Sequence, residues 1–221
     1  MYPITPIRFF YDPISPYAYL AFEQLPTALE GFSYSVAYTP ILFAGLLKTY
    51  GQLGPAEIAP KRDWTYRQVL WQAKTLGVNF QMPSQHPFNP LPLLRLAVAC
   101  SDDNGNTNRF VTQQIFNHVW HGGADAADGE RLALLTERLA GNIKCDVEVA
   151  KARLKANTEE ALRAGVFGVP SFVVDNDTAA KVFWGLDSLP MLRECLAGGA
   201  WFKEGDGWDS VAKISVGIKR V

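Results

Sequence analysis

The chain has 221 residues, of which 48% are hydrophobic and 19% are charged. Its 21 basic and 22 acidic side chains leave a formal net charge of −1 at pH 7, so the overall charge favours neither nucleic acid nor an anionic membrane surface as a partner. This composition excludes a disordered chain, a histone-like binder and a coiled coil, and the length allows one large domain or two small ones.

The sequence also indicates the cellular compartment in which we expect the protein. Its N-terminal segment lacks the charged and apolar pattern of a signal peptide, and no apolar run approaches the roughly 18–20 residues of a membrane-spanning helix. The cysteines are Cys100, Cys145 and Cys195, an odd number without a Cys-x-x-Cys pair, so neither a disulfide framework nor a zinc site follows. We expect reduced, buried thiols in a cytoplasmic protein without membrane or nucleic-acid partners.

The N-terminal part predicts a βαβ unit. The aromatic and β-branched run Ile7–Tyr11 and the alternating run Phe32–Thr39 favour strands, and the segment Tyr17–Leu29 between them favours a helix. Ser15 is a good N-cap for that helix, and Pro16 suits its first position. Two strands joined by a helix are normally parallel, with a right-handed crossover.

The rest of the chain is helical until β character returns near its end. Helices are predicted over 41–49, 61–76, 93–100, 109–120, 130–141 and 146–164, strands over 171–174 and 181–184 with a turn at 175–177, and a last helix over 187–197. The aromatic side chains Phe43, Trp64, Trp71, Phe88 and Trp120 are expected to be mostly core, although one or two could line an apolar pocket for an aromatic substrate, and Val149, Leu154 and Leu162 are expected to face inward. We assign residues 1–41 and 165–199 to one discontinuous α/β domain, residues 42–164 to a helical insertion and residues 200–221 to a C-terminal tail.

Three short segments can carry chemistry. Ser15 begins a helix, where free N–H groups and the helix dipole favour an anion and a hydroxyl can donate to it, although a plain N-cap needs no ligand. Val169-Pro170 precedes a strand, and a cis proline there would turn the valine backbone toward an extended peptide, although a trans proline is the ordinary alternative. Asp187-Ser188 begins another helix, where it can hold a ligand or simply cap.

The order of elements and several motifs resemble the glutathione-dependent 2-hydroxychromene-2-carboxylate isomerases and the kappa-class glutathione transferases. Both belong to the DsbA-like group of thioredoxin folds, so the resemblance implies an α/β thioredoxin-like fold with an inserted all-helical domain. The matching residues are Phe9–Asp12, Ser15–Leu20, Leu46–Lys48 with Gly51, Pro60–Arg62, Pro87, Asn89, Leu91, Arg95, Thr158–Ala161, Gly165–Pro170, Phe183–Gly185 and Asp187.

The resemblance assigns site residues. Ser15–Ala18 resembles the Cys-x-x-Cys of the disulfide oxidoreductases without either thiol, which excludes dithiol redox chemistry there and leaves Ser15 to stabilise the thiolate of glutathione. The implied glutathione-binding residues are Val169 and the cis Pro170 for the cysteinyl part, Asp187 with Ser188 for the γ-glutamyl end, Lys61 for a carboxylate, and Asn89. The chain departs from the usual family residues at Gln52, Gln68, Trp71, Leu186 and Ser188.

The implied activity is a glutathione-dependent isomerisation of an aromatic-derived substrate, in which the thiolate adds reversibly to a conjugated double bond. A kappa-type transferase that forms stable conjugates and a glutathione- or peptide-binding module without turnover are the alternatives. The resemblance also implies a homodimer. No metal is expected, because His118 and His121 lack a third ligand, and His86 is a weaker candidate for approaching the substrate.

Overall fold

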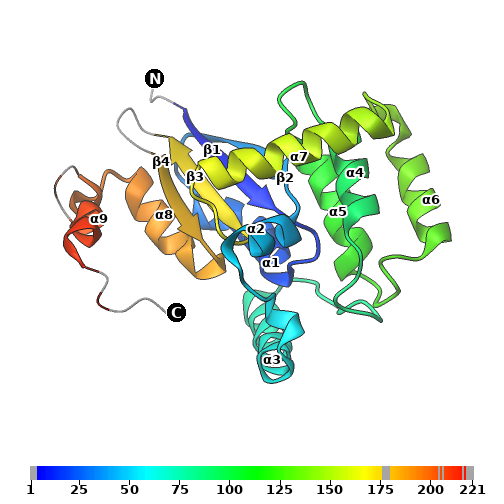
Figure 1. Cartoon of the computed structure of the whole chain (residues 1–221), viewed down its shortest axis with the longest axis horizontal. Helices are drawn as coiled ribbons and strands as arrows, with labels where there is room; N and C mark the ends of the chain where they lie inside the picture. Colours follow the sequence, from blue (N-terminus) through cyan, green and yellow to red (C-terminus); the bar gives the residue numbers. More distant parts are fainter. Residues whose placement is uncertain (1–3, 176–179, 204, 206, 216, 218–221) are drawn as a thin grey trace.

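The computed structural model describes residues 4–175, 180–203, 205, 207–215 and 217 (Figure 1). Part of the predicted turn at 175–177 and several residues of the C-terminal tail lie outside this range. Among the described residues, no helix is both long and apolar enough to cross a membrane.

A four-stranded mixed sheet forms the centre of the molecule. Its strands are β1 (Thr5–Tyr11), β2 (Tyr34–Pro40), β3 (Ser171–Asp175) and β4 (Ala180–Trp184), in the order β2-β1-β3-β4. β1 runs parallel to β2 and antiparallel to β3, and β3 and β4 form an antiparallel hairpin. The predicted parallel pair and returning hairpin are both confirmed. Strands from the N-terminal part of the chain and strands that follow the helical block therefore form one sheet.

The alternation of side chains along β1 builds two cores. Ile7, Phe9 and Tyr11 face α1 (Pro16–Ala28) and α8 (Leu189–Leu196) in the larger core. Phe10 faces the other side of the sheet, where it packs with buried residues of α2 (Phe43–Tyr50) and α7 (Val147–Arg163). Arg8 lies on that same side by the period of two and donates to Glu160 of α7 at 2.7 Å. Helices thus cover both faces of the sheet.

The remaining helices are α3 (Ala59–Leu76), α4 (Leu91–Ala99), α5 (Arg109–Trp120) and α6 (Gly129–Arg138). α5 contributes Ile115 and Phe116 to the same core as β1, and α4 packs against α7. Figure 1 shows α4, α5 and α6 together at one end of the sheet, whereas α3 projects from the body of the molecule. The helical block is therefore attached through a shared core, and its boundaries at 42 and 164 remain a prediction.

The described part of the C-terminal tail folds back onto the sheet. It contains two short 3-10 turns, η4 (Ala200–Phe202) and η5 (Val211–Lys213), and between them the one-turn helix α9 (Gly207–Ser210). The rings of Phe202 and Trp208 lie 5.9 and 5.3 Å from the ring of Phe183 on β4. These contacts cover the outer strand of the sheet on one face.

Two predictions about the core are wrong. Trp64 and Trp71 on α3 are 62% and 64% exposed, because α3 projects from the body and buries only Val69 and Ala73. Val149 in the first turn of α7 is 40% exposed, whereas the next residue, Ala150, is the one buried against α4. Periodicity alone shows that a helix has an apolar stripe and does not show whether a neighbour covers it.

The three cysteines are free thiols, and only Cys100 is fully buried, whereas Cys145 and Cys195 are partly buried. Burial raises the pKa of the Cys100 thiol to about 11, which leaves it protonated at neutral pH. The prediction of buried thiols is thus confirmed for Cys100 alone.

Candidate functional site

Ser15 ends the turn after β1 and caps α1. Its backbone is extended (φ −88°, ψ 114°), and its Oγ accepts a hydrogen bond from the Ala18 amide at 3.2 Å, with Pro16 at the start of the helix. The Tyr17 amide has no acceptor among the described residues, as expected in the first turn of a helix. The predicted N-cap is confirmed, and it leaves the hydroxyl proton available to a second partner.

That second partner is the Val169 carbonyl. Ser15 Oγ lies 3.4 Å from it, which is long for a hydroxyl hydrogen bond. The Val169–Pro170 peptide is cis, as the resemblance implies. Although Val169 is only 7% exposed, its amide has no acceptor among the residues that the structure describes. Ser15 and Val169, which are 154 residues apart, thus meet, and the Val169 amide remains free to donate to a ligand.

A buried carboxylate shapes the turn before Ser15. Asp12 is fully buried, and its two oxygens accept from the Ile14 amide and from the Phe43 amide, each at 3.0 Å. Burial raises the pKa of Asp12 to about 7, against the lowering effect of these two amide donors. Asp12 therefore joins the Ser15 turn to the first residue of α2.

His86 holds the same turn from the other side. Its Nε2 lies 2.8 Å from the Ile14 carbonyl, which can only accept, so the imidazole is protonated at Nε2. Nδ1 lies 2.8 Å from the Tyr66 hydroxyl on α3. Burial lowers the pKa of His86, so the neutral ring persists at pH 7. The structure therefore places His86 behind the turn, in a positioning role.

The segment that carries Asp187 is joined to the cis proline by a backbone hydrogen bond. The Gly185 amide donates to the Pro170 carbonyl at 2.9 Å, and Asp187 follows two residues later in the short turn η3 (Leu186–Ser188). The Asp187 side chain forms no hydrogen bond with the described residues. Burial, followed by the charge of Asp187, raises the pKa of Tyr17. A carboxylate thus faces the first turn of α1.

A groove of about 460 Å³ runs past Asp187 between α1, α3 and the start of α8. Trp71 and Leu186, two of the departures from the family pattern, line it together with Asp187. Gln68, a third departure, accepts from the Tyr17 hydroxyl at 2.6 Å. These three departures therefore lie near α1 and Asp187, whereas Gln52 lies after α2.

One detail of this region differs from the prediction. Ser188 does not cap α8 with its side chain, since its Oγ donates to the Gly185 carbonyl at 2.8 Å. Asp187 likewise lies inside a 3-10 turn rather than at a helix N-cap. The positive φ of Gly185 (95°), which favours glycine, turns the chain after β4 directly into this 3-10 turn.

The other predicted residues are not tied to this group. Lys61, in the first turn of α3, is exposed and forms no hydrogen bond or ion pair with the described residues. Asn89 accepts from the Leu91 amide at 3.1 Å, which stabilises the start of α4. The Gln52 amide donates to the Leu47 carbonyl at 2.9 Å. The roles assigned to Lys61 and Asn89 remain predictions.

The sequence gave no sign of Tyr66 or of the contact between His86 and Ile14, because both act through contacts between distant segments. The remaining histidines are engaged elsewhere: His118 Nε2 lies 3.0 Å from the Ala126 carbonyl, and His121 Nε2 lies 2.8 Å from the Tyr19 hydroxyl. Within the part of the chain that the structure describes, no three His, Cys, Asp or Glu side chains gather as a metal site would require.

The arrangement can stabilise an anion. A hydroxyl, an unpaired amide and the positive end of a 13-residue helix converge at Ser15, and the Val169 backbone lies alongside. Position 168, directly before Val169, favours glycine, because a Cβ on Gly168 would collide with the Trp184 indole. Such a site suits an extended thiol-bearing peptide whose sulfur approaches the helix N-terminus.

Comparison with known proteins gives the relatives of the chain. The family pattern described as DSBA-like thioredoxin domain matches residues 6–197. A glutathione S-transferase kappa 1 of Rattus norvegicus is 24% identical over 208 residues, covering 86% of this chain and 90% of the relative. A 2-hydroxychromene-2-carboxylate isomerase of Pseudomonas sp. (strain C18) is 26% identical over 203 residues, covering 88% and 92%.

Solved structures give the same result for the fold. A 2-hydroxychromene-2-carboxylate isomerase superposes with a TM-score of 0.68 at 20% identity, covering 96% of this chain and all of that one. The cytosolic disulfide reductase DsbM from Pseudomonas aeruginosa, solved with GSH, has a TM-score of 0.50 at 15% identity and covers 87% and 99%.

Proposed function

Because the chain belongs to the family of DSBA-like thioredoxin domains, we propose that it is a glutathione-dependent isomerase of aromatic-derived carboxylates of the 2-hydroxychromene-2-carboxylate type. The predicted thioredoxin-like fold with inserted helices is confirmed by that match and by the structural neighbour. Relatives that carry the isomerase and glutathione transferase names support an enzyme that uses glutathione.

The residues at the site fit glutathione. The buried Val169 amide and the Tyr17 amide are donors without a protein partner among the described residues. Burying a donor without an acceptor costs roughly 1–3 kcal/mol, and a bound peptide carbonyl or thiolate would remove that cost. Asp187, whose side chain has no hydrogen-bond partner among the described residues, supplies a carboxylate for the ammonium of the γ-glutamyl end.

When bound, glutathione would supply a thiolate that adds to the conjugated double bond of the substrate and leaves again after the resulting single bond has rotated. Ser15 exchanges its long bond to Val169 for a bond from its hydroxyl to the sulfur, and the dipole of α1 adds to that stabilisation. Both effects lower the pKa of a thiol, which increases the fraction of thiolate at neutral pH.

The surrounding residues keep Ser15 in place while this happens. Asp12 and His86 hold the two sides of the turn through the Ile14 amide and carbonyl. The hydroxyl therefore needs little reorganisation when the anion arrives, which is the condition under which a donor stabilises charge most effectively.

The single observation that carries the proposal is the meeting of Ser15 Oγ with the Val169 carbonyl at the N-terminus of α1. Replacing Ser15 by Ala removes the hydroxyl and leaves the helix dipole. We expect kcat/KM with 2-hydroxychromene-2-carboxylate to fall by at least about tenfold, with the same melting temperature within a few degrees.

Glutathione should be required in catalytic amount and recovered unchanged, and a chelator should have no effect. Thr at position 15, which restores a hydroxyl, should recover part of the activity. Wild-type activity in the Ser15→Ala variant, or turnover without any thiol, would overturn the proposal.

A second function, conjugation by a kappa-type transferase, has a specific observation in its favour, since transferases and isomerases match this chain at similar identity. Consumption of one glutathione per product would favour the transferase. The homodimer, the cytoplasmic location and the roles of Lys61, Asn89 and Ser188 remain part of the proposal, to be tested separately.

A further inference from the structure

A groove of about 540 Å³ lies between α2, α4 and α7, and it contains none of the candidate glutathione residues. Leu42, Leu91, Leu154 and Leu162 give it an apolar lining. Its walls are fixed, because Leu94 and Val98 of α4 pack against Ala150 and Leu154 of α7 in a small core of their own. Its volume is typical of sites for small organic molecules.

Arg95 of α4 lines this groove without a partner. It forms no hydrogen bond or ion pair with the residues that the structure describes, and its Nε is buried. A buried donor without an acceptor is costly, and a guanidinium normally pairs with a carboxylate or a phosphate. Arg95 belongs to the motif with Pro87, Asn89 and Leu91, and the proposed function gives it no role.

The other charges of the groove cancel in pairs. Lys151 lies 3.7 Å from Glu148, and Lys155 lies 3.7 Å from Glu159, all on the exposed rim of α7. Arg95 is therefore the one charge among the lining residues that no described residue balances. The groove carries a single uncompensated positive charge beside an apolar surface.

We propose that this groove is a second binding site for an amphipathic monocarboxylate, with its aryl or alkyl body against the leucines and its carboxylate on Arg95. A monoanion matches the one uncompensated charge, and a carboxylate can accept two bonds from a guanidinium. The apolar body would lie against Leu42 and Leu154, which both line the groove.

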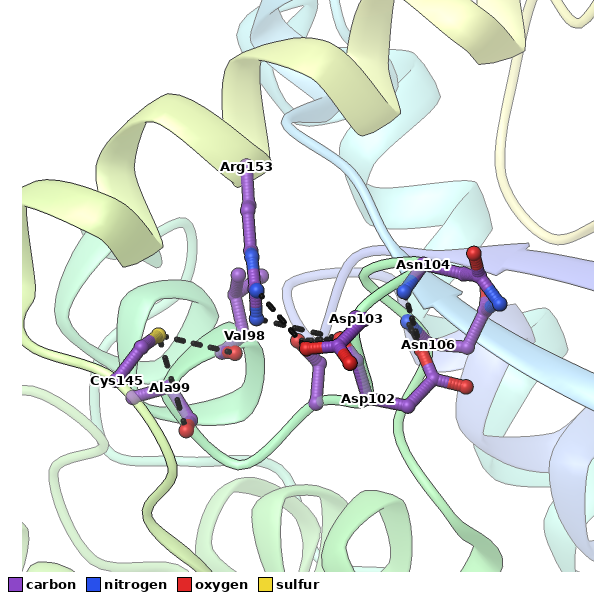
Figure 2. Close-up of polar contacts among 9 residues, drawn as sticks. Val98, Ala99, Asp102, Asp103, Asn104, Asn106, Cys145 and Arg153 are labelled. Atoms are coloured by element: carbon purple, nitrogen blue, oxygen red, sulfur yellow. Dashed lines mark hydrogen bonds and ion pairs between the residues drawn. The ribbon is translucent and has the colours of Figure 1, made fainter.

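Arg153 provides a matched control. It lies on α7 within two turns of the groove-lining residues and does not line the groove. Figure 2 shows that its guanidinium is already engaged with the loop after α4, where it donates to the Asp102 carbonyl at 3.2 Å and to the Asp103 carboxylate at 3.4 Å. Removing this arginine takes one positive charge from α7 and none from the groove.

The test uses the full chain and 2-naphthoate, with 2-naphthamide as the uncharged probe of the same shape. Binding is followed by calorimetry and by the NMR signal of the Arg95 Nε–H, assigned through its loss in Arg95→Gln. This signal reports on the groove even if naphthoate also enters the Ser15 site, so the result is independent of the proposed function.

Naphthoate should bind, shift the Arg95 signal and lose at least about tenfold in affinity in Arg95→Gln, whereas Arg153→Gln should stay within about twofold. Ala152→Trp, which keeps every charge and fills the groove from an exposed position of α7, should weaken binding as much. Wild-type affinity in Arg95→Gln, equal binding of naphthamide, or an unmoved Arg95 signal would overturn the proposal.

Discussion

At the scale of single residues, Ser15 depends on two neighbours that hold its turn. Asp12 accepts from the Ile14 amide, and His86 lies at the Ile14 carbonyl, so the amide and the carbonyl of Ile14 are both held by side chains. The Ser15 and Val169 motifs could be found in the sequence because each is local. His86 could not, because it reaches Ile14 across 72 residues and only the fold brings them together.

Asp12 gives the first prediction at this scale. Its folded pKa of about 7 lies above the ordinary value of 3.8, so the unfolded chain loses this proton at lower pH than the folded chain does. The stability that Asp12 contributes is therefore greatest in acid, falls between about pH 4 and pH 7, and is constant above that, with a total change of about 4 kcal/mol.

Urea unfolding of the wild type and of Asp12→Asn from pH 4 to pH 8 measures this effect. The wild type should lose stability relative to the variant across that window, since only the wild type titrates at position 12. A difference in unfolding free energy that stays constant with pH would contradict the raised pKa.

At the scale of elements, the sequence predicted the existence of nearly every strand and helix, with boundaries shifted by a few residues. The prediction of which side chains are buried failed for α3, a helix whose two tryptophans are not covered by any element that the structure describes. α3 has good helix formers, a proline in its first turn and Gly77 in the left-handed conformation at its end, so its local signals are complete. Those signals concern the helix alone, and the exposure of Trp64 and Trp71 follows from what lies beside it.

Two tryptophans allow a comparison between α5, a helix that the core covers, and α3, a helix that projects from the body of the molecule. Trp120 of α5 is fully buried and stacks on Phe80 at 5.2 Å between ring centroids, whereas Trp71 of α3 is 64% exposed. Trp120→Ala should cost about 3–5 kcal/mol of unfolding free energy, and Trp71→Ala should stay within about 0.5 kcal/mol. Equal losses in guanidinium unfolding would show that α3 is covered in solution.

At the scale of the whole molecule, the sheet and the helical block could be predicted from the sequence, whereas the position of the C-terminal tail could not. The sheet order and the attachment of the helical block follow from the βαβ unit, the hairpin and the apolar face of α5, all of which leave a periodic trace in the sequence. The tail leaves none. Its place is set by a few aromatic rings against Phe183, and such contacts carry no local pattern.

The tail therefore gives a prediction for the molecule as a whole. Trp208→Ala removes a partly buried ring that contacts Phe183 and Phe202, and should lower the unfolding free energy by about 1–3 kcal/mol. Val211→Ala, at a position that is 63% exposed, is the matched control and should change little. An unaffected denaturant midpoint in Trp208→Ala would mean that the tail does not support β4.

The contact chain from Tyr66 through His86 to Ile14 has a consequence for exchanging parts between relatives. The Ser15 hydroxyl lies in the N-terminal segment, yet the atoms that hold its turn come from α3 and from the proline-rich loop after it. A chimera that received residues 42–164 from another protein would inherit a different support beneath Ser15, and the proposed activity should then change although Ser15, Val169 and Asp187 stayed the same.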